Sequence, residues 1–279
     1  CSSPLLINGR FKLIRTLYDL NRNHDTDIYE AIDTTGSYQG RGVNTIKILK
    51  VLKAHDERFI DIFRQEAETL QSLEHPAIPF VDIEDFFCIH LESGPDDLYC
   101  LAMSKMEGVT LGTWVREHGR INQELAITWI HQLSEILDYV HGRGFIHRDI
   151  KPENIIVQPD LSLALIDFGF SQSNLTNATR SGNRTSSTAY NVRSFGYTAP
   201  EQNIGRSYPQ SDIYSLGRTM IVALTGKELS ELSDENSGNL QWHMNAKQIA
   251  KPIQRYIDCL TDPAIAKRPK DTHEMLSYL

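Results

Sequence analysis

Two short apolar segments joined by a turn-rich link constrain this chain more than any other feature. They are residues 155–157 and 163–166, and the five residues between them include proline and aspartate. Proline fixes φ and aspartate favours turns, so the two segments should pair as an antiparallel β-hairpin. Asn154 precedes the first segment and Asp167 follows the second, so the hairpin brings them side by side. Mg²⁺ prefers carboxylate, amide and phosphate oxygens, and the sequence therefore predicts a magnesium–phosphate site at the open end of the hairpin.

Three short motifs surround this hairpin in a fixed order. Residues 147–154 read HRDIKPEN, residues 167–169 read DFG, and residues 199–201 read APE. In this order they resemble the signature of eukaryotic-type (Hanks-type) Ser/Thr protein kinase domains, and most of all the bacterial and cyanobacterial members. One DFG triplet alone is a weak signal, but the ordered set is specific. The resemblance extends from about residue 11 to residue 279.

The resemblance implies an α+β fold, namely the two-lobed protein kinase-like fold, as a single kinase domain over residues 1–279. Residues 1–105 would form the small lobe, an antiparallel sheet with one main helix and a short N-terminal tail. Residues 106–279 would form the larger, helical lobe.

The apolar pattern by itself predicts several of these elements. Alternating and apolar runs predict strands over residues 11–17, 27–32, 45–52 and 98–103. Apolar positions at helical spacing predict helices through residues 59–73, from Asn122 to about His141, and from Ser211 to Gly226.

Composition limits the kinds of partner that the chain is expected to bind and its expected location. The formal net charge of −8 disfavours non-specific binding to nucleic acid. No apolar run approaches the roughly 18–20 residues that a membrane helix needs, so we expect no membrane segment within this chain. The four cysteines are scattered, and no pair has metal-ligand spacing, which predicts reduced thiols and a cytoplasmic location. Because the first residue is Cys1 rather than methionine, we expect part of a longer or membrane-attached protein.

The resemblance assigns a role to each polar residue around the hairpin. Asp149 would accept the proton of the substrate hydroxyl or orient it, and Lys151 would contact the γ-phosphate, as is typical of Ser/Thr-specific members. Asn154 and Asp167 would hold the metal, Mg²⁺ with Mn²⁺ as an alternative. The implied cofactor is ATP, and the implied partners are protein substrates.

A carboxylate falls on the apolar face of the helix through residues 59–73. Burying Glu66 there is costly unless a cation meets it, and the resemblance implies a lysine of the third strand as that cation. Lys47 and Lys50 are both candidates, and their spacing puts them on opposite faces of the strand. Strand alternation favours Lys50, which would hold the α- and β-phosphates, and leaves Lys47 as an exposed residue.

The resemblance places the remaining nucleotide contacts in the small lobe and just after it. Met103 would be the gatekeeper residue, and the backbone of residues 104–106 would bond adenine. The residues expected to contact the nucleotide are Leu17, Ile28, Ile48, Lys50, Met103, Ser104 and Met106.

Other positions match supporting residues of the family. His147 and Phe168 would be structural. Asp212 would cap the helix that begins near it, brace the catalytic loop, or do both. Arg268 would pair with Glu201 of the APE motif.

A long polar segment, residues 170–194, lies between the DFG and APE motifs and is rich in Ser and Thr. We expect autophosphorylation of this segment, with Arg148 as the partner of the phosphate. Residues 185–188 are the leading candidates for the modified positions, whereas Ser194 would contact the catalytic residues. Autophosphorylation in trans would require a homodimer.

One part of the family pattern is missing. The segment between the first two strands, residues 17–29, contains no glycine, although glycines normally let backbone amides approach the phosphates. This absence favours an alternative, a pseudokinase that acts as a nucleotide-binding or scaffolding module. A small-molecule kinase of related fold is a third hypothesis, which Lys151 and the APE motif disfavour.

Overall fold

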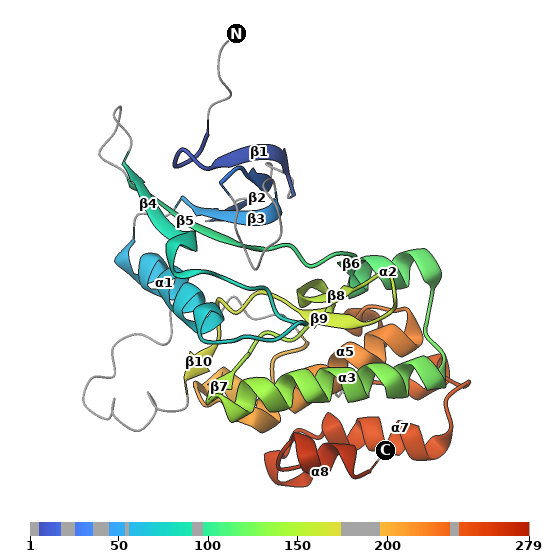
Figure 1. Ribbon diagram of the computed structural model, residues 1–279. Coiled ribbons are helices and arrows are strands. Elements are labelled where there is room, and N and C mark those ends of the chain that lie inside the picture. The colour runs from blue at the N-terminus through green and yellow to red at the C-terminus, as the bar shows by residue number, and fades with distance from the viewer. Residues whose placement is uncertain are drawn as a thin grey trace, which may run out of the picture. The chain divides into compact units, whose positions relative to one another are not determined.

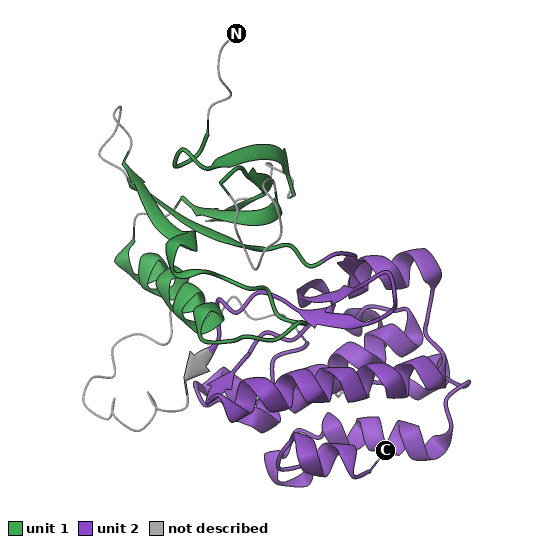
Figure 2. Cartoon of the chain, viewed as in Figure 1, with its two compact units in different colours: residues 1–106 green, residues 107–279 purple. Residues whose placement is uncertain are grey.

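The computed structural model describes residues 6–17, 26–35, 45–53, 56–90, 97–173, 196–234 and 240–278. The chain divides into two compact units, a first unit of residues 1–106 and a second unit of residues 107–279 (Figure 2). Each has its own set of secondary-structure elements (Figure 1).

The first unit is built on a five-stranded antiparallel sheet with the order β1-β2-β3-β5-β4. The four strands predicted from the sequence are all present, and β4 is an addition at the sheet edge. Their bounds are β1 Phe11–Thr16, β2 Thr26–Asp33, β3 Thr45–Leu52, β4 Phe86–His90 and β5 Asp97–Ser104.

Period-two alternation sorts the residues of this sheet onto two faces. Leu49 and Val51 of β3 pack with Phe11, Ala31 and Cys100 in a buried cluster on one face. The residues between them, such as Lys50, therefore lie on the opposite face. The helix α1, Glu57–Gln71, and the short 3₁₀ helix η1, Ile83–Asp85, complete the unit.

The second unit contains the predicted hairpin. β8 (Ile155–Val157) and β9 (Leu163–Leu165) pair antiparallel, with Ile155 opposite Leu165, which confirms the prediction. β6 (Val109–Thr110) joins them on the β8 side. A separate pair is formed by β7 (Phe145–Ile146) and β10 (Gln172–Ser173).

Helices make up most of the second unit, and α3 packs against both α5 and α8. Their bounds are α2 Leu111–His118, α3 Gln123–Gly142, α5 Pro209–Thr225, α6 Leu229–Leu232, α7 Lys251–Leu260 and α8 Thr272–Leu276. The 3₁₀ helices are η2 Pro152–Asn154, η3 Gln202–Ile204, η4 His243–Asn245 and η5 Ile265–Lys267.

The ends of the two long helices test the sequence-based bounds. The side chain of Asn122 accepts the backbone N–H of Leu125, so α3 begins where the cap signal predicted. α5 begins at Pro209, two residues before the predicted start, because proline suits the first helical turn. Its end at Gly226, in the left-handed conformation with φ +65°, is as predicted.

These elements confirm the predicted α+β, kinase-like architecture, with a small antiparallel-sheet unit that carries one main helix and a larger helical unit. Within the described ranges, no helix is both long and apolar enough to span a membrane.

Candidate active site

The HRDIKPEN segment is held in place by one buried carboxylate of α5. Asp212 accepts the backbone N–H groups of His147 at 2.9 Å and Arg148 at 2.8 Å, and its carboxylate also lies 2.9 Å from His141 Nε2. Burial acts to raise the pKa of Asp212, but these hydrogen bonds and the nearby histidines hold it below its ordinary value. Asp212 therefore braces the segment as an anion, and it lies inside the first turn of α5 rather than capping it.

His147 is fully buried behind the same segment. Its Nε2 lies 3.1 Å from the carbonyl oxygen of Ile166, and its Nδ1 accepts the backbone N–H of Asp149. A carbonyl can only accept, so Nε2 carries the proton and the ring is neutral. Burial lowers the pKa of His147 in the same sense. The ring meets Phe168 edge to face at 4.6 Å, so both residues have the structural role that was expected.

Two polar side chains, those of Lys151 and Asn154, converge on Asp149. Lys151 Nζ lies 2.8 Å from Asp149 Oδ2. Asn154 Nδ2 donates to the backbone oxygen of Asp149 at 2.8 Å and to Oδ2 at 2.9 Å. The amide of Asn154 thus fixes the carboxylate of Asp149, and its own oxygen is the atom suited to a cation.

The hairpin brings Asp167 to this cluster. The backbone N–H of Ile166 donates to the carbonyl of Asn154 at 2.9 Å, which joins the two open ends as predicted. The charges of Asp149 and Asp167 both act to raise the pKa of the His147 imidazole, against the larger effect of burial. An amide oxygen and a carboxylate are a donor set that fits Mg²⁺.

Two residues of this region have a backbone conformation that is uncommon for side chains other than glycine. Arg148 has φ +72° and Asp167 has φ +65°. Such conformations cost about 1–3 kcal/mol and persist where the surrounding contacts impose them. Here Asp212 fixes Arg148, and the β8–β9 hairpin fixes the start of the DFG motif.

In the first unit, Lys50 and Glu66 form a buried ion pair with Nζ and Oε1 2.5 Å apart. The pair joins β3 to α1, and it is the pair that the family resemblance implied. The expectation for the other lysine was wrong. Lys47 is not exposed but buried, and its Nζ lies 2.9 Å from Asp85 Oδ2. A lysine can occupy the buried face of β3 because the carboxylate of η1 compensates its charge.

The predicted nucleotide contacts differ in exposure. Met103 is buried, whereas Leu17 is exposed and Ile28 and Ile48 are half-buried. Ser104 is engaged within the first unit, because its backbone N–H donates to the carbonyl of Phe80 and its hydroxyl accepts the Phe80 N–H. Met106 is half-buried, and their contacts with a nucleotide stay a prediction. The glycine-free residues 18–25 lie outside the described ranges.

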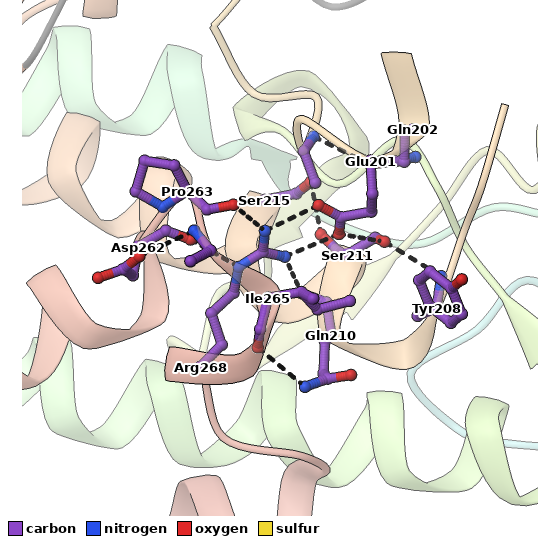
Figure 3. Close-up of polar contacts among 12 residues, drawn as sticks. Glu201, Gln202, Tyr208, Gln210, Ser211, Ser215, Asp262, Pro263, Ile265 and Arg268 are labelled. Atoms are coloured by element: carbon purple, nitrogen blue, oxygen red, sulfur yellow. Dashed lines mark hydrogen bonds and ion pairs between the residues drawn. The ribbon is translucent and has the colours of Figure 1, made fainter. Parts of the chain in front are cut away.

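The APE motif is anchored by the predicted pair of Glu201 and Arg268 (Figure 3). Two parallel contacts of 2.8 Å join the guanidinium to both carboxylate oxygens, and Ser211 Oγ donates to Glu201 at 2.6 Å. Burial acts to raise the pKa of Glu201, but Arg268 and Ser211 hold it below its ordinary value. Arg268 also donates to the backbone carbonyls of Gln210 and Asp262.

Sequence reasoning missed three residues that support these groups. Gln202 donates to the carbonyl of Arg148 and accepts the N–H of Ala199, so it ties the catalytic segment to the APE motif. His141 supports Asp212, and Asp85 compensates Lys47. The only local signal was the position of Gln202 next to the APE motif, because the other two contacts join residues far apart in the chain.

The residues proposed for modification give no geometric test. Residues 185–188 and Ser194 lie outside the described ranges, as does all of 174–195. The guanidinium of Arg148, their expected partner, is partly buried, and burial lowers its pKa. Its Nη1 donates to the carbonyl of Phe170 at 3.4 Å.

Comparison with known proteins identifies the family. The model of the protein kinase domain matches residues 36–277. The chain belongs to the protein kinase domain family. Serine/threonine-protein kinase C of Synechocystis sp. is 32% identical over 271 residues, which are 92% of this chain and 47% of that protein. Serine/threonine-protein kinase PknB of Mycobacterium tuberculosis is 30% identical over 236 residues, which are 82% and 36% of the two chains.

The fold agrees with this assignment. The crystal structure of Rad53 1–466 in complex with AMP-PNP matches with a TM-score of 0.67 and 23% identity, covering 96% of this chain and 64% of that one. The chain spans about half the length of the Synechocystis relatives that it matches. It spans 36% of the length of the Mycobacterium relative. The predicted Hanks-type Ser/Thr kinase class, and with it the phosphotransferase class of enzyme, is confirmed at the level of the family, which generally uses ATP and a divalent metal.

Proposed function

We propose that this kinase domain transfers the γ-phosphate of ATP to Ser or Thr hydroxyls of protein substrates, with Mg²⁺ as the metal. The single observation that carries the proposal is the cluster of Lys151 and Asn154 around the carboxylate of Asp149, with Lys151 Nζ and Asn154 Nδ2 2.8 Å and 2.9 Å from its Oδ2. Phosphoryl transfer needs positioning and charge neutralisation more than covalent participation of the enzyme, and this cluster supplies both.

In the proposed reaction, the substrate hydroxyl oxygen forms a bond to the γ-phosphorus while the bond from that phosphorus to the β–γ bridging oxygen breaks. Asp149 orients the hydroxyl and receives its proton, and ADP leaves with the bridging oxygen. Lys151 neutralises charge on the transferred phosphoryl group. Asn154 limits the rotation of Asp149 because it bonds both the carboxylate and the backbone oxygen of that residue.

The metal and the remaining phosphates have their own residues. Asn154 and Asp167 would hold Mg²⁺, which supplies charge neutralisation at the phosphate oxygens when bound. Lys50 would hold the α- and β-phosphates. Glu66 keeps the lysine ammonium at a fixed point of the sheet face, since its Oε1 lies 2.5 Å from Lys50 Nζ. The adenine contacts proposed are those of Met103, Ser104 and Met106.

We further propose autophosphorylation in the segment 170–194, in trans between two copies of the chain. Its support is chemical. Arg148 is a cation beside Asp149 whose Nε has no hydrogen-bond partner among the described residues, and a phosphate would supply charge-assisted bonds of about 1.5–3 kcal/mol each. Residues 185–188 are the proposed positions.

One observation favours a second candidate function. Residues 17–29 contain no glycine and three aspartates, which would repel phosphate if they faced it. A pseudokinase would bind nucleotide or a partner protein without turnover. The intact set of Asp149, Lys151, Asn154 and Asp167 makes the active kinase the better supported candidate.

The decisive experiment incubates the domain with Mg²⁺ and γ-labelled ATP, beside Asp149→Ala, Asp167→Ala and the exposed control Asp61→Ala. We expect label on the wild type and on Asp61→Ala, with labelling at least ~10²–10⁴-fold slower for Asp149→Ala, the range for loss of a general base. Label lost when residues 185–188 are all changed to alanine would place the modification there. A domain that takes no label but melts at a higher temperature with ATP would be the pseudokinase.

A further inference from the structure

A thiol, an imidazole and a carboxylate gather at one end of the β4–β5 pair, and none of the three residues has a role in the function proposed above. The strand register is the cause. His90 of β4 is directly opposite Asp97 of β5, and Cys88 lies two residues before His90 on the same strand. Residues two apart in a strand share a face, and directly opposed residues share one too. All three side chains therefore leave the sheet on the same side.

This side is the face that also carries Lys50, not the face of the apolar cluster. Phe87, Ile89 and Leu98 alternate with the three residues and pack against that cluster. Two of the three side chains are also open to solvent, since His90 is 81% and Asp97 41% exposed. Packed apolar residues on the opposite face of the sheet thus support the group, and its own face is open to solvent at His90 and Asp97.

The donor atoms are close enough to share one ion. His90 Nδ1 and Asp97 Oδ1 are 2.6 Å apart, and one donor atom from each of the three residues lies within 4.8 Å of the other two. Asp97 also lies beside the Cys88 thiol, whose pKa is raised by burial and then by that carboxylate. Around tetrahedral zinc, bonds of ~2.0–2.3 Å put neighbouring donors roughly 3.3–3.8 Å apart. Zinc binding would require the three side chains to rotate until their donor atoms reach that spacing.

We propose that Cys88, His90 and Asp97 form a zinc site that clips the ends of β4 and β5 together, with water in the fourth position. The mixed sulfur, nitrogen and oxygen donors select a borderline-soft ion over Mg²⁺, whereas the oxygen donors of Asn154 and Asp167 suit the hard ion. Cysteine spacing gave no sign of the site, because only one cysteine takes part and the third ligand comes from the neighbouring strand.

The site has a structural consequence. Among the strands that the structure describes, β4 lies at the edge of the sheet and pairs with β5 on one side (Figure 1). An ion held by residues of both strands fixes their register at the end where the ladder stops at His90 and Asp97. Zinc binding to the folded sheet should therefore stabilise the domain, and the stabilisation should grow with the logarithm of the free zinc concentration once the site is occupied.

Cobalt and zinc binding to the metal-free domain test this, with excess Mg²⁺ present to fill the oxygen-donor site. We expect one equivalent of Co²⁺ to give the near-ultraviolet band of thiolate coordination and the intense visible bands of a tetrahedral ion. Zn²⁺ should displace the Co²⁺ and raise the melting temperature. Cys88→Ser should abolish the thiolate band, and the exposed variant His90→Ala should weaken Zn²⁺ binding at least ~10–100-fold, the cost of disturbing a ligand environment.

Cys259→Ser and Cys1→Ser are the matched controls, because they remove thiols outside the cluster. Both should keep the full cobalt spectrum. A wild-type spectrum without a thiolate band overturns the proposal, as does a band that survives Cys88→Ser or disappears in either control. Neither result depends on kinase activity, so the site and the proposed function are tested separately.

Discussion

Each of the two faces of β3 carries a buried lysine that forms an ion pair with a carboxylate. The two pairs have the same chemistry, but their carboxylates come from different elements. Lys50 meets Glu66 at 2.5 Å and Lys47 meets Asp85 at 2.9 Å. Glu66 belongs to α1, whereas Asp85 belongs to η1. The difference teaches that burial and charge pairing do not by themselves mark a functional lysine.

The Lys47 pair is part of a closed network. Arg10 Nη2 lies 2.6 Å from Asp33 and 3.0 Å from Asp85, so two cations and two anions neutralise one another. This network joins Arg10, the residue before β1, to β2, β3 and η1. The Lys50 pair joins one strand to one helix, and its cation is the one proposed to serve the nucleotide.

The largest expected effect is on stability and separates the two pairs. Lys47→Met leaves the network with an excess buried negative charge, and we expect a loss of about 3–5 kcal/mol in the free energy of unfolding. Lys50→Met should lose less, because its side chain is 11% exposed against 4% for Lys47. Urea denaturation measures both values.

The double variant Lys47→Met/Asp85→Asn serves as the control for that result. It removes the excess charge and should recover part of the lost stability. Equal losses for Lys47→Met and Lys50→Met, with no recovery in the double variant, would remove the distinction between the two faces.

The next largest effect is on catalysis. Here the substitution of Lys50 should have the greater effect, whereas the substitution of Lys47 has the greater effect on stability. Lys50→Met should slow phosphoryl transfer by about 10²–10³-fold, roughly 2.7–4 kcal/mol, as for the loss of one donor to a developing charge. Lys47→Met should keep its turnover at a temperature where it remains folded. Initial rates with γ-labelled ATP, together with ATP-induced thermal shifts, report this. The opposite ranking would mean that the assignment of the two lysines is reversed.

A smaller effect on stability is expected from Asp33, one of the two carboxylates of the network. Burial acts to raise the pKa of Asp33, but hydrogen bonds from Arg10 and Thr35 hold it below its ordinary value of 3.8. A lowered pKa means that the folded state favours the carboxylate, so the stabilisation is complete above pH 3.8 and is lost as the pH falls through the folded-state value.

Asp33→Asn should therefore destabilise the domain by on the order of 1.5–3 kcal/mol at neutral pH, the worth of hydrogen bonds to a charged group. The difference in the free energy of unfolding between the variant and the wild type should decrease as the pH falls below 3.8. Urea denaturation between neutral and acidic pH measures this, with the exposed Asp61→Asn as a control that should change stability by less than about 0.5 kcal/mol. If this difference stays constant or increases in acid, the stabilisation comes from the packing of the side chain and not from its charge.

The parts of the fold that the sequence predicted share one property, namely that they depend on neighbours in the chain. The β8–β9 hairpin follows from the turn residues between two apolar runs, and the start of α3 follows from the cap at Asn122. The start of α5 was missed by two residues because Pro209 extends the first turn. The edge strand β4 was missed because only its pairing with β5 makes it a strand.

The site divides in the same way. The order of HRDIKPEN, DFG and APE sufficed to predict which residues meet around Asp149, because the hairpin between them is local. The resemblance also implied the support of the catalytic segment by Asp212. The contacts of His141 with Asp212 and of Gln202 with Arg148 were missed, because they join residues 71 and 54 positions apart and no local pattern encodes them.

The sequence by itself determined the kinase family, the hairpin, the main helices and the identity of the polar groups that surround Asp149. Only the tertiary structure decided that Lys47 is buried against Asp85 and that Cys88, His90 and Asp97 converge. The physical reason is that strand alternation fixes the face on which a side chain lies, whereas the charge that compensates it comes from wherever the folded chain returns.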